Sequence, residues 1–339
     1  MRLELENNSR DGRPSSLPSA EGAANGGLRA LTDRLLIWLI LAAIVALLAF
    51  GLENFWSTGN LVNIVRQAAI VGLLATGVTV VLIAGHFDLS VGATLMLAAV
   101  TSLLMQPLDA GSTTLAIAVP LLVGLTIGAI NGGLVGGIGA NSIVITVGMQ
   151  FMLVGATLLL VAGQHVRVDG AAAAYIAIGG GSVAGVPIPV LLMLAVSVLA
   201  HIVLTRTLFG RHLAAIGGNP TAAAFVGIPV GRRVAAAYMI SGLLAALAGV
   251  VLAARVRNLD PTSGAGYELA ALTAVVLGGT RLTGGSGSAM NTLAGVLILG
   301  VVANAMRLLD LSYSFQLLLQ GLVLLAAIAI EARLRTDQR

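Results

Sequence analysis

Long apolar segments alternate with short polar or glycine-rich breaks along most of this chain. A helix needs about 20 mainly apolar residues to cross a bilayer, and fewer if it crosses only part of it. The pattern therefore predicts an all-α, polytopic membrane domain over residues 35–332. We expect about ten spans, of which 91–105 and 267–279 are short, near residues 35–52, 68–84, 91–105, 114–135, 142–162, 189–205, 234–254, 267–279, 288–305 and 316–331.

The composition agrees with a membrane protein. Hydrophobic residues make up 58% of the chain and charged residues 9%, and the mean hydropathy is +1.00. A soluble domain carries roughly 25% charged residues, so this chain cannot cover a soluble surface. Cysteine is absent, and the four histidines are scattered without metal-ligand spacing. Because no convergent set of nucleophile, base or metal ligands is visible, we expect neither an enzyme nor a bound cofactor.

The arginines predict how the chain crosses the membrane. Residues 1–34 hold five arginines and five acidic residues in a polar stretch, which predicts a disordered tail. If the N-terminus is cytoplasmic, 13 of the 18 arginines fall on cytoplasmic segments and five on outer segments. The positive-inside rule then favours two cytoplasmic termini, with a short C-terminal tail at 333–339.

The internal loop at 206–233 contains a short helix signal, GGNPTAAAFVGIPV (217–230). Asn219 is a suitable N-cap, Pro220 suits the first helical position, and Gly227 ends the helix. A helix of this length is not stable alone. Two interpretations follow: the helix docks into a groove on a cytosolic partner, or it only connects two spans.

Three long blocks resemble the permease subunits of bacterial ribose-type ABC importers. They are LIAGHFDLSVGATLMLAA (82–99), TRTLFGRHLAAIGGNPTAAAFVGIPVGRRVAAAYMISGLLAALAGVVLAAR (205–255) and PTSGAGYELAALTAVVLGGTRLTGGSGSAMNTLAGVLILGVV (261–302). The resemblance runs from about residue 54 to residue 330 and does not include the tail. His86 and Phe87 depart from the ribose permease's usual Gly–Ile, and Ala270 stands where that permease tends to carry an acid.

The resemblance implies an inner-membrane permease that acts as a dimer, with itself or with a close relative. It implies cytosolic ATPase subunits and a periplasmic binding protein as partners, with membrane lipid around the spans and no nucleic acid. It also favours docking over mere connection for the loop at 206–233. The residues that would contact the ATPase are Gly217, Gly218, Asn219, Pro220, Ala223 and Gly227.

The absence of lysine supports separate ATPase subunits. A P-loop needs G-x-x-x-x-G-K-[ST], in which the lysine reaches the β- and γ-phosphates. The Gly-rich stretch GGTRLTGGSGS (278–288) lacks that lysine, as does the whole chain. ATP is therefore expected to bind to another polypeptide, or else transport is not driven by ATP.

Two polar breaks occupy comparable places in the two halves of the chain. AGHFDLSVG (84–92) and the Gly-rich stretch at 278–288 each separate two apolar segments, one of them short. Such a pair points to an internal repeat around a transport path, although glycines also permit close helix packing. The pattern therefore predicts two pseudo-symmetric halves with broken or short helices.

Polar residues inside the apolar segments are candidates for the solute path. A sugar needs amides and hydroxyls, so the candidates are Asp88, Ser90, Asn131, Gln150, Asn291 and Asn304. An asparagine between helices also serves to join them by hydrogen bonds. For Asp88, capping of the span that starts near Ser90 is favoured over solute contact. Glu268 is expected to stabilise the first turn of its own helix.

Other transport classes remain open at this stage. An ion-coupled secondary transporter usually needs intramembrane ionisable groups, and Asp88 and Glu268 both lie near span ends. An ABC permease for branched-chain amino acids or nucleosides is a nearer alternative. The sequence does not identify the solute.

Overall fold

The computed structural model describes residues 20–52, 55–106 and 112–336, and these residues are almost wholly helical. Most of the predicted tail, 1–19, and residues 337–339 lie outside the described residues. The long helices are α1 (Ala20–Gly51), α2 (Thr58–Ile83), α4 (Ser112–Gly132), α5 (Ser142–Leu160), α7 (Ile188–Arg206), α10 (Val230–Val256), α12 (Ala289–Leu308) and α13 (Tyr313–Thr336). The shorter ones are α3 (Val91–Leu104), α6 (Ala173–Gly180), α8 (Leu208–Gly218), α9 (Pro220–Phe225) and α11 (Tyr267–Leu277).

The helices agree with an all-α polytopic membrane protein. Six of the described helices are long and apolar enough to cross a membrane: α2, α4 with its π-helical extension Gly133–Gly137, α5, α7, α10 and α12. Four shorter apolar helical stretches, Leu36–Gly51, Val91–Leu104, Tyr267–Leu277 and Ser314–Ala326, lie at the other predicted positions. The total of ten spans stays a prediction, because these four stretches are short.

Two helices begin earlier than the hydrophobic pattern predicted. α1 starts at Ala20, inside the segment assigned to the disordered tail. α2 starts at Thr58, ten residues before the predicted span at 68–84. The predicted span began after Arg66, because a charged residue interrupts the apolar pattern there. In the structure Arg66 is part of α2, and its guanidinium donates a hydrogen bond to the Gly180 carbonyl at 2.8 Å.

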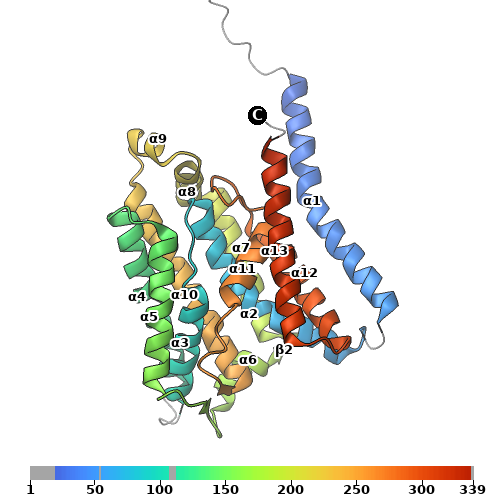
Figure 1. The fold of residues 1–339 in the computed structure, drawn as a ribbon, viewed down its shortest axis with the longest axis vertical. Coiled ribbons are helices and arrows are strands. Elements are labelled where there is room, and N and C mark those ends of the chain that lie inside the picture. Colours follow the sequence, from blue (N-terminus) through green and yellow to red (C-terminus); the bar gives the residue numbers. More distant parts are fainter. Residues whose placement is uncertain (1–19, 53–54, 107–111, 337–339) are drawn as a thin grey trace, which may run out of the picture.

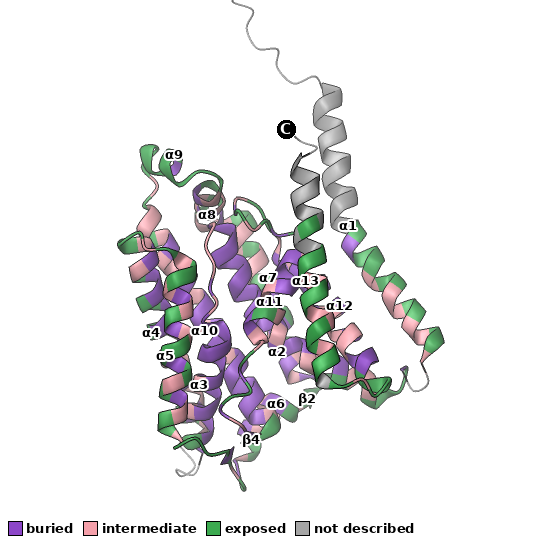
Figure 2. Cartoon of the chain, in the orientation of Figure 1, coloured by how far each residue is buried: buried purple, intermediate pink, exposed green. Residues whose placement is uncertain are grey.

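The core of the bundle is built around α10. This helix packs mainly against α2, α3 and α4, and α2 and α10 are largely buried (Figure 2). Glycines allow the close contact between α4 and α10, since a side chain at Gly124 or Gly128 would collide with the α10 backbone. In contrast, α5 exposes large apolar side chains such as Phe151 and Leu159, as a lipid-facing helix does.

The two ends of the bundle differ. At one end lie α8 and α9, together with the start of α1 and the end of α13 (Figure 1). At the other end lie α6 and two short antiparallel strand pairs. β1 (Val166–Arg167) pairs with β4 (Asn258–Leu259), and β2 (Ser182–Val183) pairs with β3 (Val186–Pro187).

Candidate coupling surface and solute path

The predicted loop helix is present, but the loop contains two helices. Asn219 ends α8 and caps α9, because its Oδ1 accepts the Ala222 backbone N–H at 2.9 Å. Pro220 occupies the first position of α9, and Gly227 turns the chain with a positive φ of 83°. The predicted cap at Asn219 and start at Pro220 are confirmed, and Gly217 and Gly218 form the last turn of α8.

α9 exposes small side chains at Thr221, Ala222 and Ala224, but not at Ala223. Ala223 is 4% exposed and packs in a cluster with Leu213, Ile216 and Val234. Phe225 and Val226 are 87% and 78% exposed at the end of the helix. These two residues form an exposed apolar tip that was not predicted from the sequence. Such a surface is a candidate contact for a protein partner.

Glycines join the end of α8 directly to both polar breaks. A side chain at Gly217 would collide with the Ile83 carbonyl and with Gly285. The Gly285 N–H donates to the Ile83 carbonyl at 2.9 Å. Gly85 and Gly284, both with positive φ, also lie against each other, since a Cβ on Gly284 would come 2.6 Å from the Gly85 Cα. The breaks at 84–92 and 278–288 thus meet beneath α8.

Asp88 lies at the centre of a buried hydrogen-bond network between three helices. The Ser90 hydroxyl donates to Asp88 Oδ1 at 2.6 Å, and the Ser241 hydroxyl of α10 donates to Oδ2 at 2.8 Å. Asn131 of α4 donates to the Ser90 hydroxyl at 2.9 Å. Asp88 also accepts the backbone N–H of Ser90, which is the N-cap of α3, but no side chain caps the first turn of this helix, so the predicted capping by Asp88 is not seen. Ser241 was not anticipated from the sequence.

Gln150 joins a second buried carboxylate. Its amide nitrogen donates to Glu268 Oε1 at 3.2 Å, and the Gly266 N–H lies 3.2 Å from each carboxylate oxygen. A side chain at Gly92 of α3 would collide with Glu268. Glu268 therefore holds the start of α11, as expected, and also fixes how α11 meets α5 and α3.

The last two candidates lie elsewhere along α12. Asn304 and Asn60 exchange two amide hydrogen bonds, at 2.6 and 3.1 Å, and so join α12 to α2. Asn291 is half-buried in the first turn of α12, where its backbone N–H lies 3.3 Å from the Ser288 hydroxyl. The structure therefore brings Asp88, Ser90 and Asn131 together, while Gln150, Asn291 and Asn304 lie apart from them.

A cavity of about 590 Å³ lies between α2, α11, α12 and α13. Its polar lining consists of Gln67, Thr262, Ser263, Tyr267, Gln316 and Gln320, and Ala270 is also part of the wall. In the described part of the chain, none of the six candidate path residues lines it. The sequence signal for it was weak: Gln316 and Gln320 stand one turn apart on a single helix face.

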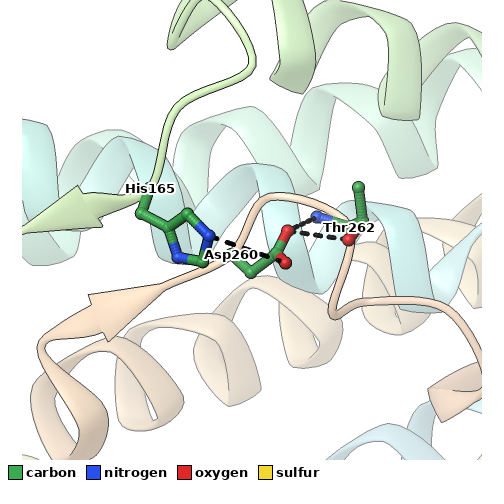
Figure 3. A network of polar contacts seen from close by, with 3 residues as sticks. All are labelled: His165, Asp260 and Thr262. Carbon is green, nitrogen blue, oxygen red and sulfur yellow. Dashed lines mark hydrogen bonds and ion pairs between the residues drawn. The ribbon is translucent and has the colours of Figure 1, made fainter.

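The rim of this cavity is held by a polar turn (Figure 3). Asp260 Oδ1 accepts the Thr262 N–H at 2.8 Å and the Thr262 hydroxyl at 2.7 Å. These hydrogen bonds hold the pKa of the exposed Asp260 carboxyl below its usual value. His165 Nε2 lies 3.9 Å from Asp260 Oδ2, and the neighbouring β1–β4 pair joins the same two segments. This turn positions Thr262 and Ser263 at the cavity.

The chain is similar in sequence to known membrane transport proteins. The ribose import permease protein of Haemophilus influenzae is 36% identical over 302 residues, covering 88% of this chain and 92% of the relative. That of Bacillus subtilis is 38% identical over 296 residues, 87% and 90% of the two chains. The L-arabinose ABC transporter permease protein of Azospirillum brasilense is 31% identical over 320 residues, 94% of each chain. No solved structure matches the chain.

The apolar helical bundle and these relatives together identify the chain as a polytopic membrane permease. Residues 60–328 match the family described as the permease component of the branched-chain amino acid transport system. The chain belongs to this family, which is a family of transport permeases and not of enzymes.

Proposed function

We propose that this chain is the membrane-spanning permease subunit of an ABC importer that moves a monosaccharide or a related small polar solute. The relatives are named as permeases for ribose, D-allose and L-arabinose. These names favour a sugar over a branched-chain amino acid or a nucleoside. Separate subunits bind and hydrolyse ATP, and the permease alternates access to the solute.

The partners follow from the same proposal. A cytosolic ATPase docks at the end of the bundle that carries α8 and α9, and a periplasmic binding protein delivers the solute at the opposite end. A second permease subunit, identical or closely related, completes the path in the bacterial inner membrane. The arginine distribution supports this orientation, with both termini on the cytoplasmic side.

The observation that carries the proposal is the combination of an exposed apolar tip and a backbone contact behind it. Phe225 and Val226 expose apolar surface that a protein partner can bury on binding. Gly217 then touches the end of α2 and the loop at 278–288 without an intervening side chain. A displacement of α8 and α9 by the ATPase therefore reaches both breaks directly.

Five of the six residues predicted for coupling divide into three roles under this proposal, and Gly218 has none. Asn219, Pro220 and Gly227 shape α9, while Gly217 transmits its movement. Ala223 anchors α9 on the bundle, and Gly218 is exposed and has open space around it. Two hydrogen-bond networks hold the helices whose ends must move. One is formed by Asp88 with Asn131, and the other by Glu268 with Gln150.

The test compares two matched valine substitutions in the reconstituted importer. Val226→Ser removes apolar surface from the tip, whereas Val183→Ser makes the same change at a 57% exposed residue at the opposite end. We expect Val226→Ser to lower ATPase co-purification and ATP-dependent uptake of labelled D-ribose, L-arabinose or D-allose, and Val183→Ser to leave ATPase co-purification unchanged. Equal co-purification of the ATPase with the two variants would contradict docking at α9.

A further inference from the structure

The cavity between α2, α11, α12 and α13 has an uncharged polar lining drawn from four segments. α2 contributes Gln67, the turn before α11 contributes Thr262 and Ser263, and α13 contributes Gln316 and Gln320. Tyr267 lies at the start of α11. Amide and hydroxyl groups both donate and accept hydrogen bonds, which is what a molecule with many hydroxyl groups needs.

The charge of the lining limits what the cavity can hold. Among the described residues that line it, none is charged. Arg66 precedes Gln67 in the chain, but its guanidinium donates to the Gly180 carbonyl of α6 and is not part of the wall. Arg255 and Arg307 also lie outside the wall, although Arg255 is close enough to Tyr267 to interact with it electrostatically. A carboxylate or phosphate in the cavity would therefore lose its water without a charged group in the wall to replace it, which is unfavourable.

The shape of the cavity also fits a small polar molecule. Its volume of about 590 Å³ falls within the range of roughly 300–1,000 Å³ that is typical of small-molecule sites. Gln316 and Gln320 stand on one face of α13, because residues four apart are neighbours on a helix surface. Val71, Val296 and Val323 supply apolar wall that can pack against the C–H faces of a sugar ring.

We propose that this cavity is a binding site within the permease for neutral polyhydroxylated solutes, and that it excludes their anionic forms. The inference rests on the proposed function and deepens it, because it gives the permease a solute selectivity of its own. The principal contacts are made by Gln67, Gln316 and Gln320, and Thr262 and Ser263 act at the rim.

The absence of cysteine from the chain allows a direct test. Ala270→Cys places a single thiol in the cavity wall, and Ser182→Cys places one on the exposed β2 strand as a control. Each variant is purified with its ATPase partner in nanodiscs, without the binding protein, and labelled with a polar maleimide. The added solutes are D-ribose, L-arabinose or D-allose, and the anion D-gluconate.

A bound solute should slow labelling of Ala270→Cys by the factor 1 + [L]/Kd, which is about tenfold at roughly ten times Kd. At least one neutral sugar should give this protection in a saturable manner, D-gluconate should give none, and Ser182→Cys should be unaffected. Gln320→Ala in the Ala270→Cys background should weaken the protection. Gln164→Ala, at an exposed glutamine outside the cavity, should not.

Three results would overturn the proposal. One is equal protection by D-gluconate, and another is no labelling of Ala270→Cys, which would mean that lipid or the second permease fills the cavity. The third is no protection by the sugar that the same complex transports. ATP-dependent uptake by the wild-type complex is measured in parallel. Its absence for all of these sugars would count against the proposed function, and uptake without protection counts against the cavity alone.

Discussion

The backbone N–H of Gly285 donates a hydrogen bond to the carbonyl oxygen of Ile83 at 2.9 Å, although the two residues lie in different halves of the chain. Ile83 is the last residue of α2, and Gly285 lies in the loop between α11 and α12. Gly217 of α8 packs against both. The two breaks in the apolar pattern are therefore one contact region, and α8 lies on it.

This arrangement predicts opposite outcomes for two adjacent glycines. Gly217→Ala places a methyl group against the Ile83 carbonyl and Gly285, so α8 must separate from the breaks. Gly218→Ala meets open space. We expect Gly217→Ala to reduce ATP-dependent uptake by roughly tenfold or more, equivalent to about 1.4 kcal/mol in the rate-limiting barrier. Gly218→Ala should remain close to wild type in the same reconstituted assay.

Membrane insertion provides the check on that result. Both variants should reach normal levels in the membrane, because neither change lies in the middle of a span. Equal uptake by the two variants would show that α8 does not transmit movement through Gly217.

Asp88→Ala is expected to lower the stability of the protein more than it changes solute preference. The substitution leaves the Ser90 and Ser241 hydroxyls without their buried acceptor, and each such loss is worth about 1–3 kcal/mol. Thermal unfolding followed by size-exclusion chromatography measures the effect. Asp169→Ala, at an exposed ion pair with Arg167, is the control and should unfold at the wild-type temperature. Wild-type stability of Asp88→Ala with an altered solute range would reverse this assignment.

The local features of the coupling loop could be predicted from sequence, and its surface could not. The cap of Asn219 on Ala222 depends on residues three apart, so the residue types alone indicated it. Which face of α9 meets the bundle depends on Leu213, Ile216 and Val234, and this contact buries Ala223 while it exposes Phe225. Burial of Ala223 between the exposed Ala222 and Ala224 could therefore not be predicted from the sequence.

The polar networks show the same limit over longer distances. Asp88 was recognisable beside Ser90, but its partner Ser241 is 153 residues away in α10. The cavity combines Gln67 with Gln320, which no sequence pattern connects. Isolated polar residues in apolar segments could thus be found from the sequence, but their grouping required the packing of the helices.

The proposed orientation predicts the side of the membrane for two loops. A reporter fused after Arg233 should be cytoplasmic, and one inserted near Val168 should be periplasmic. The two positions lie toward opposite ends of the bundle, with α7 crossing between them. Reporter activity on the same side at both positions would mean that α7 does not span the membrane.

The contact between Gly92 and Glu268 gives a prediction about packing. A methyl group at Gly92 would collide with the Glu268 carboxylate and come 2.9 Å from the Gly264 carbonyl oxygen. Overpacking of this kind costs about 1–3 kcal/mol, so Gly92→Ala should lower the unfolding temperature.

Removing the carboxylate should relieve part of that strain. Glu268→Ala alone also destabilises the protein, since it leaves Gln150 without its acceptor. If the two residues are in contact as the structure shows, the double variant should be less destabilised than the sum of the single ones. An interaction free energy of about 0.5 kcal/mol or more is expected for contacting residues. Relief should remain partial, because the Gly264 carbonyl is still close to the new methyl group. Strict additivity in the cycle would contradict this packing of α3 against α11.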